Sequence, residues 1–303
     1  MPFKLVKGEI ALLRQGANRM VGSEPDGDGV WFKPDNPDNL TNFNGRTSKF
    51  NKGGFINLRF EGIDALEIHY QGERQLLAPA KKARDELLKA LGFTSVTFEP
   101  KKGAKVTAST PEKIKAHILT RGLDDTNNHR PISFVYLGGH PKKDGSDIFL
   151  KVAEADQSLN AELMRKGLVY PLYYETLPPD IRDHLTELAI DAFNGNKGLW
   201  NGIDSSNDFN TIKGMQDLRE LAIWPKLFRR LKDYFSKRPK GNIKKFDEAL
   251  RNGTVKGIED DDLTIVAETH VEANANIHDI YEVEGSSKIR MKFYPEEIIV
   301  KGD

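Results

Sequence analysis

The chain has 303 residues, of which 38% are hydrophobic and 30% charged, and it contains no cysteine. The lack of cysteine excludes disulfides, thiolate zinc sites, iron–sulfur clusters and cysteine nucleophiles. No apolar run reaches the roughly 18 residues of a membrane-spanning helix, so we expect no membrane association. Lysine plus arginine equals aspartate plus glutamate at 45 each, so the net charge predicts no partner.

The first part of the chain predicts short strands separated by turns. Residues 8–14 and 29–33 are candidate strands. Residues 34–54 are rich in Pro, Asp, Asn and Gly, which is typical of a long exposed loop. Apolar and polar side chains alternate through residues 55–63, which predicts one half-buried strand.

Further along the chain the sequence predicts helices as well as strands. Residues 79–91 predict a helix, because Pro79 suits a first turn, apolar residues recur at helical spacing and Gly92 can end it. The remaining pattern predicts strands at 94–99, 115–120 and 132–137, then helices at 160–167 and 180–194. This order indicates an α+β fold in which helices pack on a small barrel.

A smaller α+β domain is expected at the C-terminal end. Residues 203–210 are typical of a linker, residues 210–250 of helices, and residues 263–300 of strands. We therefore predict two domains, comprising residues 1–204 and 205–303.

The C-terminal part has an uneven charge distribution. Residues 226–245 carry nine basic side chains and one acidic one, whereas residues 259–284 carry nine acidic side chains and no lysine or arginine. Aromatic residues between the basic ones are consistent with a nucleic-acid surface. They also recur at helical spacing, which favours a buried core. The basic block therefore either binds nucleic acid through its exposed face or pairs with the acidic stretch, and the domain could equally bind a protein partner.

Several motifs occur in the order seen in one known family. Residues 55–69, FINLRFEGIDALEIH, resemble the Arg–x4–Asp–x2–Glu segment of the staphylococcal nuclease (thermonuclease) family. The other similar segments are Asp26–Asp28, Asn127–Tyr136, Ser158–Leu168 and His184–Trp200. The resemblance covers about residues 8–200, apart from long insertions near 34–53, 100–113 and 138–157.

The resemblance implies a five-stranded OB-type β-barrel with three packed helices and a calcium-dependent nuclease acting on DNA, RNA or both. It assigns seven positions to one site: the metal ligands Asp28, Asp64 and Ala65 (the last through its backbone carbonyl), the general base Glu67, the phosphate-binding Arg59 and Arg130, and the nucleotide contact Tyr173. These residue types suit the reaction. A hard cation prefers oxygen ligands, a carboxylate can deprotonate water, and a guanidinium fork matches phosphate oxygens.

The sequence departs from the family pattern at three positions near this site. Gly29 replaces the usual Thr and so removes a hydroxyl near the metal, and Leu66 replaces the usual Pro. Glu175 stands where a second nucleotide-contacting tyrosine is expected, with Tyr174 as a possible substitute. An acid there would repel a substrate phosphate, so we expect weaker substrate binding.

Two other questions stay open at this level. A non-catalytic OB-fold module that binds nucleic acid or protein is the alternative to an enzyme, although pure binding does not require Glu67. The first seven residues lack the apolar segment of a signal peptide. Localisation therefore stays undecided between a cytoplasmic protein and a secreted one whose chain has been trimmed.

Overall fold

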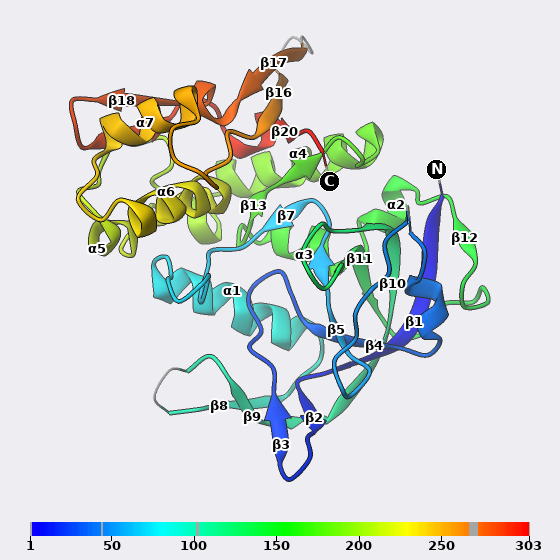
Figure 1. Ribbon diagram of the computed structural model, residues 1–303. Coiled ribbons are helices and arrows are strands. Elements are labelled where there is room, and N and C mark those ends of the chain that lie inside the picture. Colours follow the sequence, from blue (N-terminus) through cyan, green and yellow to red (C-terminus); the bar gives the residue numbers. More distant parts are fainter. Residues whose placement is uncertain (1, 44, 101–102, 267–271, 303) are drawn as a thin grey trace. The chain divides into compact units, whose positions relative to one another are not determined.

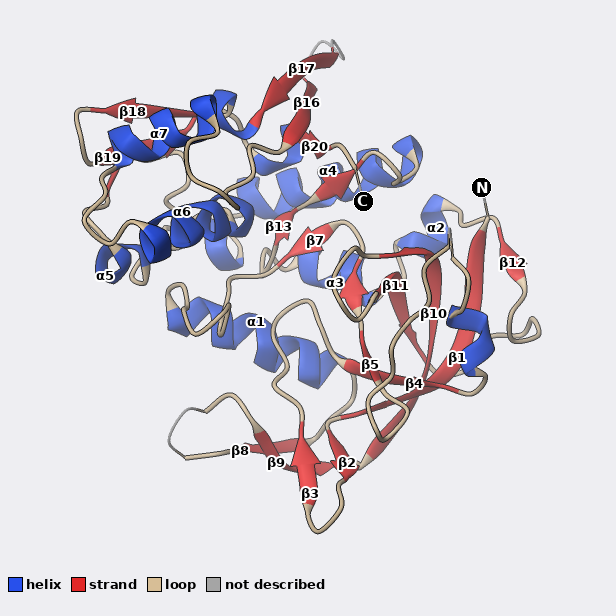
Figure 2. Ribbon diagram, in the orientation of Figure 1, coloured by secondary structure: helices blue, strands red, loops and turns tan. Residues whose placement is uncertain are grey.

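The computed structural model describes residues 2–43, 45–100, 103–266 and 272–302, which form a mixed α+β structure (Figure 1, Figure 2). The chain divides into two compact units. The first comprises Met1–Glu61 and Lys82–Leu163, and the second comprises Gly62–Lys81 and Met164–Gly302. The predicted boundary between residues 204 and 205 therefore lies inside the second unit. Parts of the predicted insertions and of the acidic stretch, at residues 44, 101–102 and 267–271, lie outside the described residues.

The first unit is built on one curved sheet with the strand order β5-β4-β1-β10-β11-β6, and β12 pairs with β1. The bounds are β1 Phe3–Ala11, β4 Trp31–Pro34, β5 Ile56–Asn57, β6 Arg59–Phe60, β10 Lys113–Leu123, β11 Pro131–Leu137 and β12 Asp147–Ile148. The two end strands, β5 and β6, are separated in the chain only by Leu58. The sheet therefore curls into a nearly closed, barrel-like form.

The central strands of this sheet are largely buried, whereas β4 at its side alternates between buried and half-buried residues. β11 is buried at six successive positions, and β1 pairs with β10 in antiparallel register from Lys4↔Thr120 to Ala11↔Lys113. Phe3, Phe32 and Phe134 fill its interior. The single strand predicted at 55–63 was wrong. The structure divides it into β5, β6 and β7 (Ile63–Asp64), with Gly62 in a left-handed conformation at φ +76°.

The remaining elements of the first unit are short. They are β2 Leu13–Gln15 with β3 Met20–Gly22, β8 Ser95–Phe98 with β9 Val106–Thr110, the 3-10 helix η1 Pro37–Leu40, and the helix α2 Val152–Ala155. Two helices continue from one unit into the other: α1 Leu77–Ala90 and α3 Leu159–Arg165. Among the described residues, none of the helices combines the length and hydrophobicity that crossing a membrane requires.

The second unit combines helices with three small sheets. Its helices are α4 Pro179–Asn194, α5 Met215–Leu218, α6 Pro225–Lys237 and α7 Ile243–Asn252, with 3-10 helices η2 Gly198–Trp200, η3 Ile277–Asp279 and η4 Pro295–Glu297. The sheets are β13-β7, β14-β20-β16-β17 and β15-β19-β18. The strand bounds are β13 Tyr170–Pro171, β14 Tyr173–Tyr174, β15 Asn210–Thr211, β16 Asp262–Val266, β17 Glu272–Asn276, β18 Tyr281–Glu284, β19 Lys288–Met291 and β20 Ile298–Val300.

Backbone pairing explains why residues 164–204 belong with the C-terminal residues. β14 pairs in parallel with β20, so that Tyr173 lies opposite Ile299. The indole Nε1 of Trp224 donates a hydrogen bond of 3.1 Å to the carbonyl of Pro171. The aromatic residues of the basic block are buried, which confirms that they belong to a core: Trp224, Phe228, Tyr234, Phe235 and Phe246.

Candidate functional site

Three of the predicted site residues lie together at one edge of the first unit's sheet. β6 is the edge strand, and its Arg59 lies opposite Ile132 in the parallel pairing with β11. Arg130 precedes Ile132 by two residues. The backbone N–H of Phe60 donates to the carbonyl of Asp28 at 3.1 Å. Three segments far apart in the sequence therefore bring Asp28, Arg59 and Arg130 to the same sheet edge.

Arg130 is oriented by an aspartate that the sequence analysis did not select. Asp124 is fully buried, and its carboxylate accepts hydrogen bonds from Nε of Arg130 at 2.7 Å and from the backbone N–H of Arg130 at 2.8 Å. Burial alone would raise the pKa of Asp124, but the Arg130 guanidinium and the hydrogen bonds from Thr126 and Arg130 outweigh it and lower that pKa. The sequence feature that could have identified Asp124 is its position at the start of a polar turn, where aspartate often binds nearby backbone N–H groups.

The turn around Gly29 accounts for one departure from the family pattern. A Cβ atom at this position would lie 2.8 Å from Oδ1 of Asp26 and 3.2 Å from the backbone oxygen of Leu58. The Leu58 oxygen belongs to the backbone and cannot move aside as a flexible side chain can. A side chain at this position would therefore require the Asp26 carboxylate and the Leu58 carbonyl to shift.

The predicted carboxylates Asp64 and Glu67 belong to the second unit. Asp64 ends β7 and lies opposite Tyr170 of β13. The backbone N–H of Glu67 donates to Oε1 of Gln75 at 3.1 Å, and the N–H of Gln75 returns a bond of 2.9 Å to the carbonyl of Glu67. Gln75 is fully buried and also donates to the carbonyl of Ile223 at 2.7 Å. These bonds fix the backbone that carries Asp64, Ala65 and Glu67.

A single arginine of α6 contacts both carboxylates. The Arg229 Nη2 lies 2.7 Å from Oδ2 of Asp64, and its Nη1 lies 3.0 Å from Oδ1 of Asp64 and 2.8 Å from Oε1 of Glu67. The exposed side-chain fractions are 18% for Arg229, 6% for Asp64 and 16% for Glu67. Burial alone would lower the pKa of Arg229, but the two carboxylates outweigh burial and raise it well above its ordinary value.

The neighbouring cations of α6 contact the acidic stretch. Lys226 lies 2.9 Å from Asp261, and Arg230 donates to Asp261 through two nitrogens at 2.6 Å and to Glu259 at 3.0 Å. The alternative in which the basic block pairs with the acidic stretch is therefore confirmed for these residues. Other basic side chains of the block are exposed, and for them nucleic-acid binding stays a prediction: Arg238, Lys240, Lys244 and Lys245.

The arrangement of Asp64 and Glu67 does not fit a calcium ion. Calcium takes six to eight oxygen ligands, yet both oxygens of Asp64 and one of Glu67 contact the Arg229 guanidinium. The described part of the chain holds no group of three or more histidine or acidic side chains that could bind a metal. Two carboxylates do converge on one cation, but that cation is an arginine.

Tyr173, the predicted nucleotide contact, is buried. Its side chain is fully covered, and its hydroxyl accepts a hydrogen bond of 3.1 Å from Oγ1 of Thr186. Burial raises its pKa. The carboxylate of Glu175 accepts a hydrogen bond of 3.3 Å from the backbone N–H of Gly302. In this structure Tyr173 therefore packs in the core of the second unit. Its predicted contact with a nucleotide stays a prediction.

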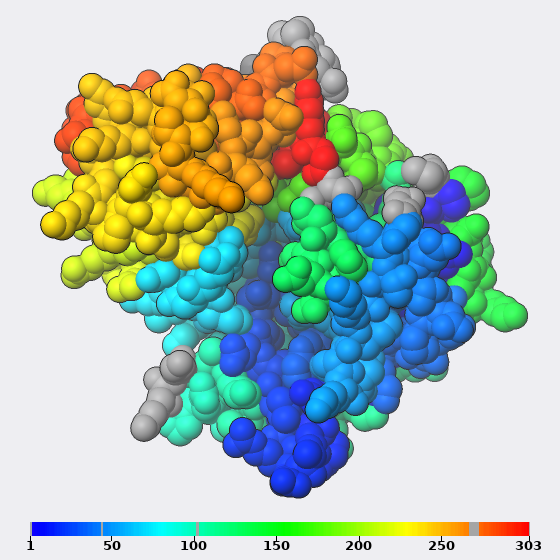
Figure 3. All heavy atoms as spheres, in the orientation of Figure 1, coloured from blue at the N-terminus to red at the C-terminus, as the bar shows by residue number. Residues whose placement is uncertain are grey.

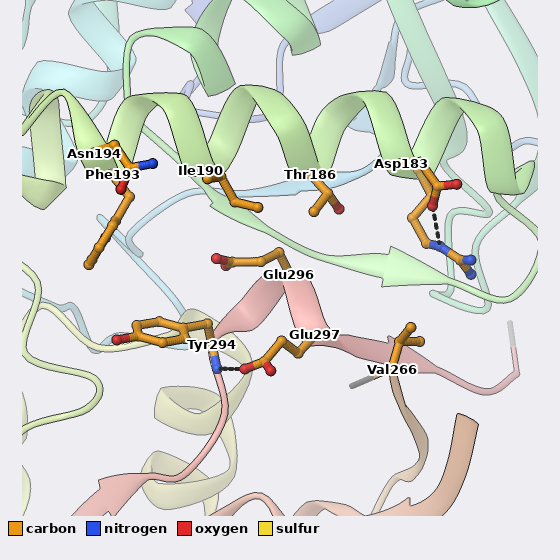
Figure 4. A pocket seen from close by; sticks show the side chains of 10 residues that line it. Asp183, Thr186, Ile190, Phe193, Asn194, Val266, Tyr294, Glu296 and Glu297 are labelled. Carbon is orange, nitrogen blue, oxygen red and sulfur yellow. Dashed lines mark hydrogen bonds and ion pairs between the residues drawn. The ribbon is translucent and has the colours of Figure 1, made fainter. Parts of the chain in front are cut away.

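The second unit also contains a pocket of about 500 Å³ (Figure 4). Residues of α4, the end of β16 and the turn at η4 line it: Arg182, Asp183, Thr186, Ile190, Phe193, Asn194, Val266, Tyr294, Glu296 and Glu297. Burial raises the pKa of Glu296 to about 7. In the close view its carboxyl points into the space between α4 and Tyr294. None of the seven predicted site residues is among the lining residues.

No protein-family model matches the chain, and none of the curated proteins matches it either. The resemblance described above therefore rests on the ordered motifs of this sequence.

Proposed function

We propose that the chain is a nuclease that hydrolyses phosphodiester bonds of DNA, RNA or both, and that its nearly closed sheet is an OB-type barrel. The observation that supports this function best is the placement of Asp28, Arg59 and Arg130 at one sheet edge by three distant segments. Backbone pairing brings the segments that carry these residues together, and two guanidinium groups with a carboxylate are the residue types that a phosphodiester-cleaving site needs.

Each assigned residue has a defined chemical task. Glu67 takes the proton of the attacking water. Arg59 and Arg130 bind the phosphate and stabilise the negative charge that grows on it in the transition state. Asp124 acts through Arg130, since it binds the Nε of that side chain and not its terminal nitrogens. In this proposal Asp124 fixes the guanidinium through Nε, and the terminal nitrogens bind the phosphate.

Calcium is varied in the cleavage assay below but has no part in the proposed catalytic steps. The resemblance implies calcium dependence with Asp28, Asp64 and the Ala65 carbonyl as ligands. The Asp64–Arg229 contact excludes a calcium ion from this arrangement of the carboxylates. We therefore derive no catalytic step through a metal.

The test is a cleavage assay on plasmid DNA, single-stranded DNA and RNA, each with calcium, with magnesium and with EDTA. We expect Glu67→Gln to reduce the rate about 100-fold or more. Arg59→Lys and Arg130→Lys keep the charge but lose the fork, and we expect losses of about 100-fold for each. Glu73→Gln is the matched control, because Glu73 is a carboxylate of the same unit that pairs with Arg219. Equal cleavage by wild type and Glu67→Gln would reject the assignment.

A second candidate is a nucleic-acid-binding module without catalysis. The contact of Arg229 with both Asp64 and Glu67 favours it, because a neutralised carboxylate pair suits a structural role. Retained binding of single-stranded DNA in a gel-shift assay, with no cleavage under any metal condition, would select this candidate.

A further inference from the structure

We infer that the pocket of the second unit binds a small organic cation, whose apolar body lies against the aromatic wall and whose ammonium or amidinium group lies beside the carboxyl of Glu296. The pocket contains none of the residues assigned to the nuclease, so this inference does not depend on the proposed function. The carboxyl of Glu296 points into the space between α4 and Tyr294 (Figure 4).

The size and apolar surface of the pocket suit a small molecule. Its volume of about 500 Å³ lies in the range of roughly 300 to 1,000 Å³ that is usual for ligand sites. Seven large hydrophobic side chains are exposed among the described residues, and three of them line this one pocket: Ile190, Phe193 and Tyr294. Exposed apolar side chains that gather around a hollow are typical of a binding site.

Two aromatic rings form a wall that exists before a ligand arrives. The ring of Phe193 packs edge-to-face on Tyr294, with centroids 5.6 Å apart, and on Trp200, with centroids 5.8 Å apart. These contacts restrict the Phe193 ring, so less conformational freedom is lost on binding. The face of an aromatic ring also attracts a positive charge. The wall therefore accepts both a flat apolar body and a cation.

The charges of the pocket favour a cation over an anion. Four charged residues line it, and two of them offset each other, because Nε of Arg182 lies 3.7 Å from Oδ1 of Asp183. The other two are the acids Glu296 and Glu297. Burial raises the pKa of Glu296, and the nearby carboxylates of Glu297 and Asp204 raise it further. The charges that act on Glu296 are therefore negative.

A bound cation would supply the charge that Glu296 lacks. Ionised Glu296 is penalised by burial and by two like charges, and an ammonium or amidinium group beside it reduces both costs. Ionisation of Glu296 and binding of the cation then favour each other. A neutral ligand of the same shape gains only the contacts with the aromatic wall, and an anion is repelled.

The experiment is calorimetric titration of the full chain at pH 8 with benzamidine, an aromatic cation, and with benzamide, its neutral counterpart. We expect benzamidine to bind at least about 10-fold more tightly than benzamide, because it makes a charge-assisted hydrogen bond. Glu296→Gln should remove this preference and leave the affinity for benzamide unchanged. Asp183→Asn is the matched control, since Arg182 already offsets that carboxylate, and its benzamidine affinity should stay within about 2-fold of wild type.

The wild-type protein alone provides a second measurement. With a pKa of about 7, Glu296 is about one-tenth ionised at pH 6 and about nine-tenths ionised at pH 8. Benzamidine should therefore bind about 10-fold more tightly at pH 8 than at pH 6, whereas the affinity for benzamide should not change. This measurement does not require any variant to fold.

Three results would overturn the inference. The first is benzamidine that binds wild type no better than benzamide, or does not bind at all. The second is an equal loss of benzamidine affinity in Glu296→Gln and Asp183→Asn. The third is a benzamidine affinity that is the same at pH 6 and pH 8.

Discussion

The two units each neutralise a buried aspartate with an arginine, but over very different distances in the chain. In the first unit Asp124 and Arg130 are six residues apart and belong to one turn. In the second unit Asp64 and Arg229 are 165 residues apart, on β7 and α6. Asp124 and Asp64 are both buried, so both carboxylates need a partner.

The two contacts differ in how much of the aspartate's burial is offset by local backbone groups. Asp124 also accepts hydrogen bonds from the backbone of Thr126 and Arg130, so the turn itself supplies part of its compensation. Asp64 and Glu67 obtain their guanidinium only when α6 has packed in the second unit. The distant contact therefore forms only with tertiary folding, whereas the local contact belongs to a single turn. Atoms of the α6 region are yellow in the space-filling view (Figure 3).

Removing the distant arginine should have the largest effect on stability. Arg229→Ala leaves Asp64 and Glu67 without their cation, and we expect a loss of about 3 kcal/mol in the free energy of unfolding. Urea denaturation followed by tryptophan fluorescence measures it. Arg219→Ala is the control, because Arg219 contacts Glu73 over 146 residues but is 41% exposed, so its loss should stay below about 1 kcal/mol. Equal losses would show that burial does not decide the effect.

Breaking the local contact should cost less and depend on pH. Asp124→Asn removes a charge-assisted hydrogen bond, and we expect a loss of about 2 kcal/mol at pH 7. Because the pKa of Asp124 is lowered on folding, its contribution is present above the unfolded pKa of about 3.9 and is lost as the pH falls through the folded value. Unfolding midpoints at pH 7 and pH 3 test this. A difference between wild type and variant that persists unchanged at pH 3 would contradict it.

Glu296 should show a pH dependence opposite to that of Asp124, because its pKa is raised on folding and that of Asp124 is lowered. Burial raises the pKa of Glu296 to about 7. The ionised form is therefore penalised in the folded state as the pH rises from about 4.3 to about 7. Glu296→Gln should stabilise the protein by about 1 kcal/mol at pH 8 and have no effect at pH 4. Thermal melts at both pH values give the comparison, and a destabilising effect at pH 8 would count against it.

An exposed ion pair should have the smallest effect. Lys113 lies 2.6 Å from Glu9 on the adjacent strand, with side chains 56% and 28% exposed. Glu9→Gln should change the free energy of unfolding by less than about 0.5 kcal/mol. The same urea assay applies, and a loss near 2 kcal/mol would show that exposure does not distinguish this pair from Asp124–Arg130.

Local patterns predicted many of the elements. The helix expected at 180–194 is α4, Pro179–Asn194, and the strand expected at 132–137 is β11, Pro131–Leu137. In α4 apolar residues recur at helical spacing, and β11 is a short, mostly apolar run; a short window of sequence contains either signal in full. The strand expected at 55–63 was wrong because Gly62 changes the direction of the backbone, and alternation of side chains does not report that change.

The candidate site residues could be chosen from the sequence alone, because they belong to motifs that occur in a fixed order along it. It also contained the aromatic spacing that placed Trp224 and Phe228 in a core. It could not assign Arg229 to Asp64 and Glu67, because nine basic residues of one block were equivalent by composition. Only the packing of α6 directs Arg229 to β7 and Arg230 to Asp261. Side-chain partners 165 residues apart are chosen by burial and geometry, which exist only once the chain has folded.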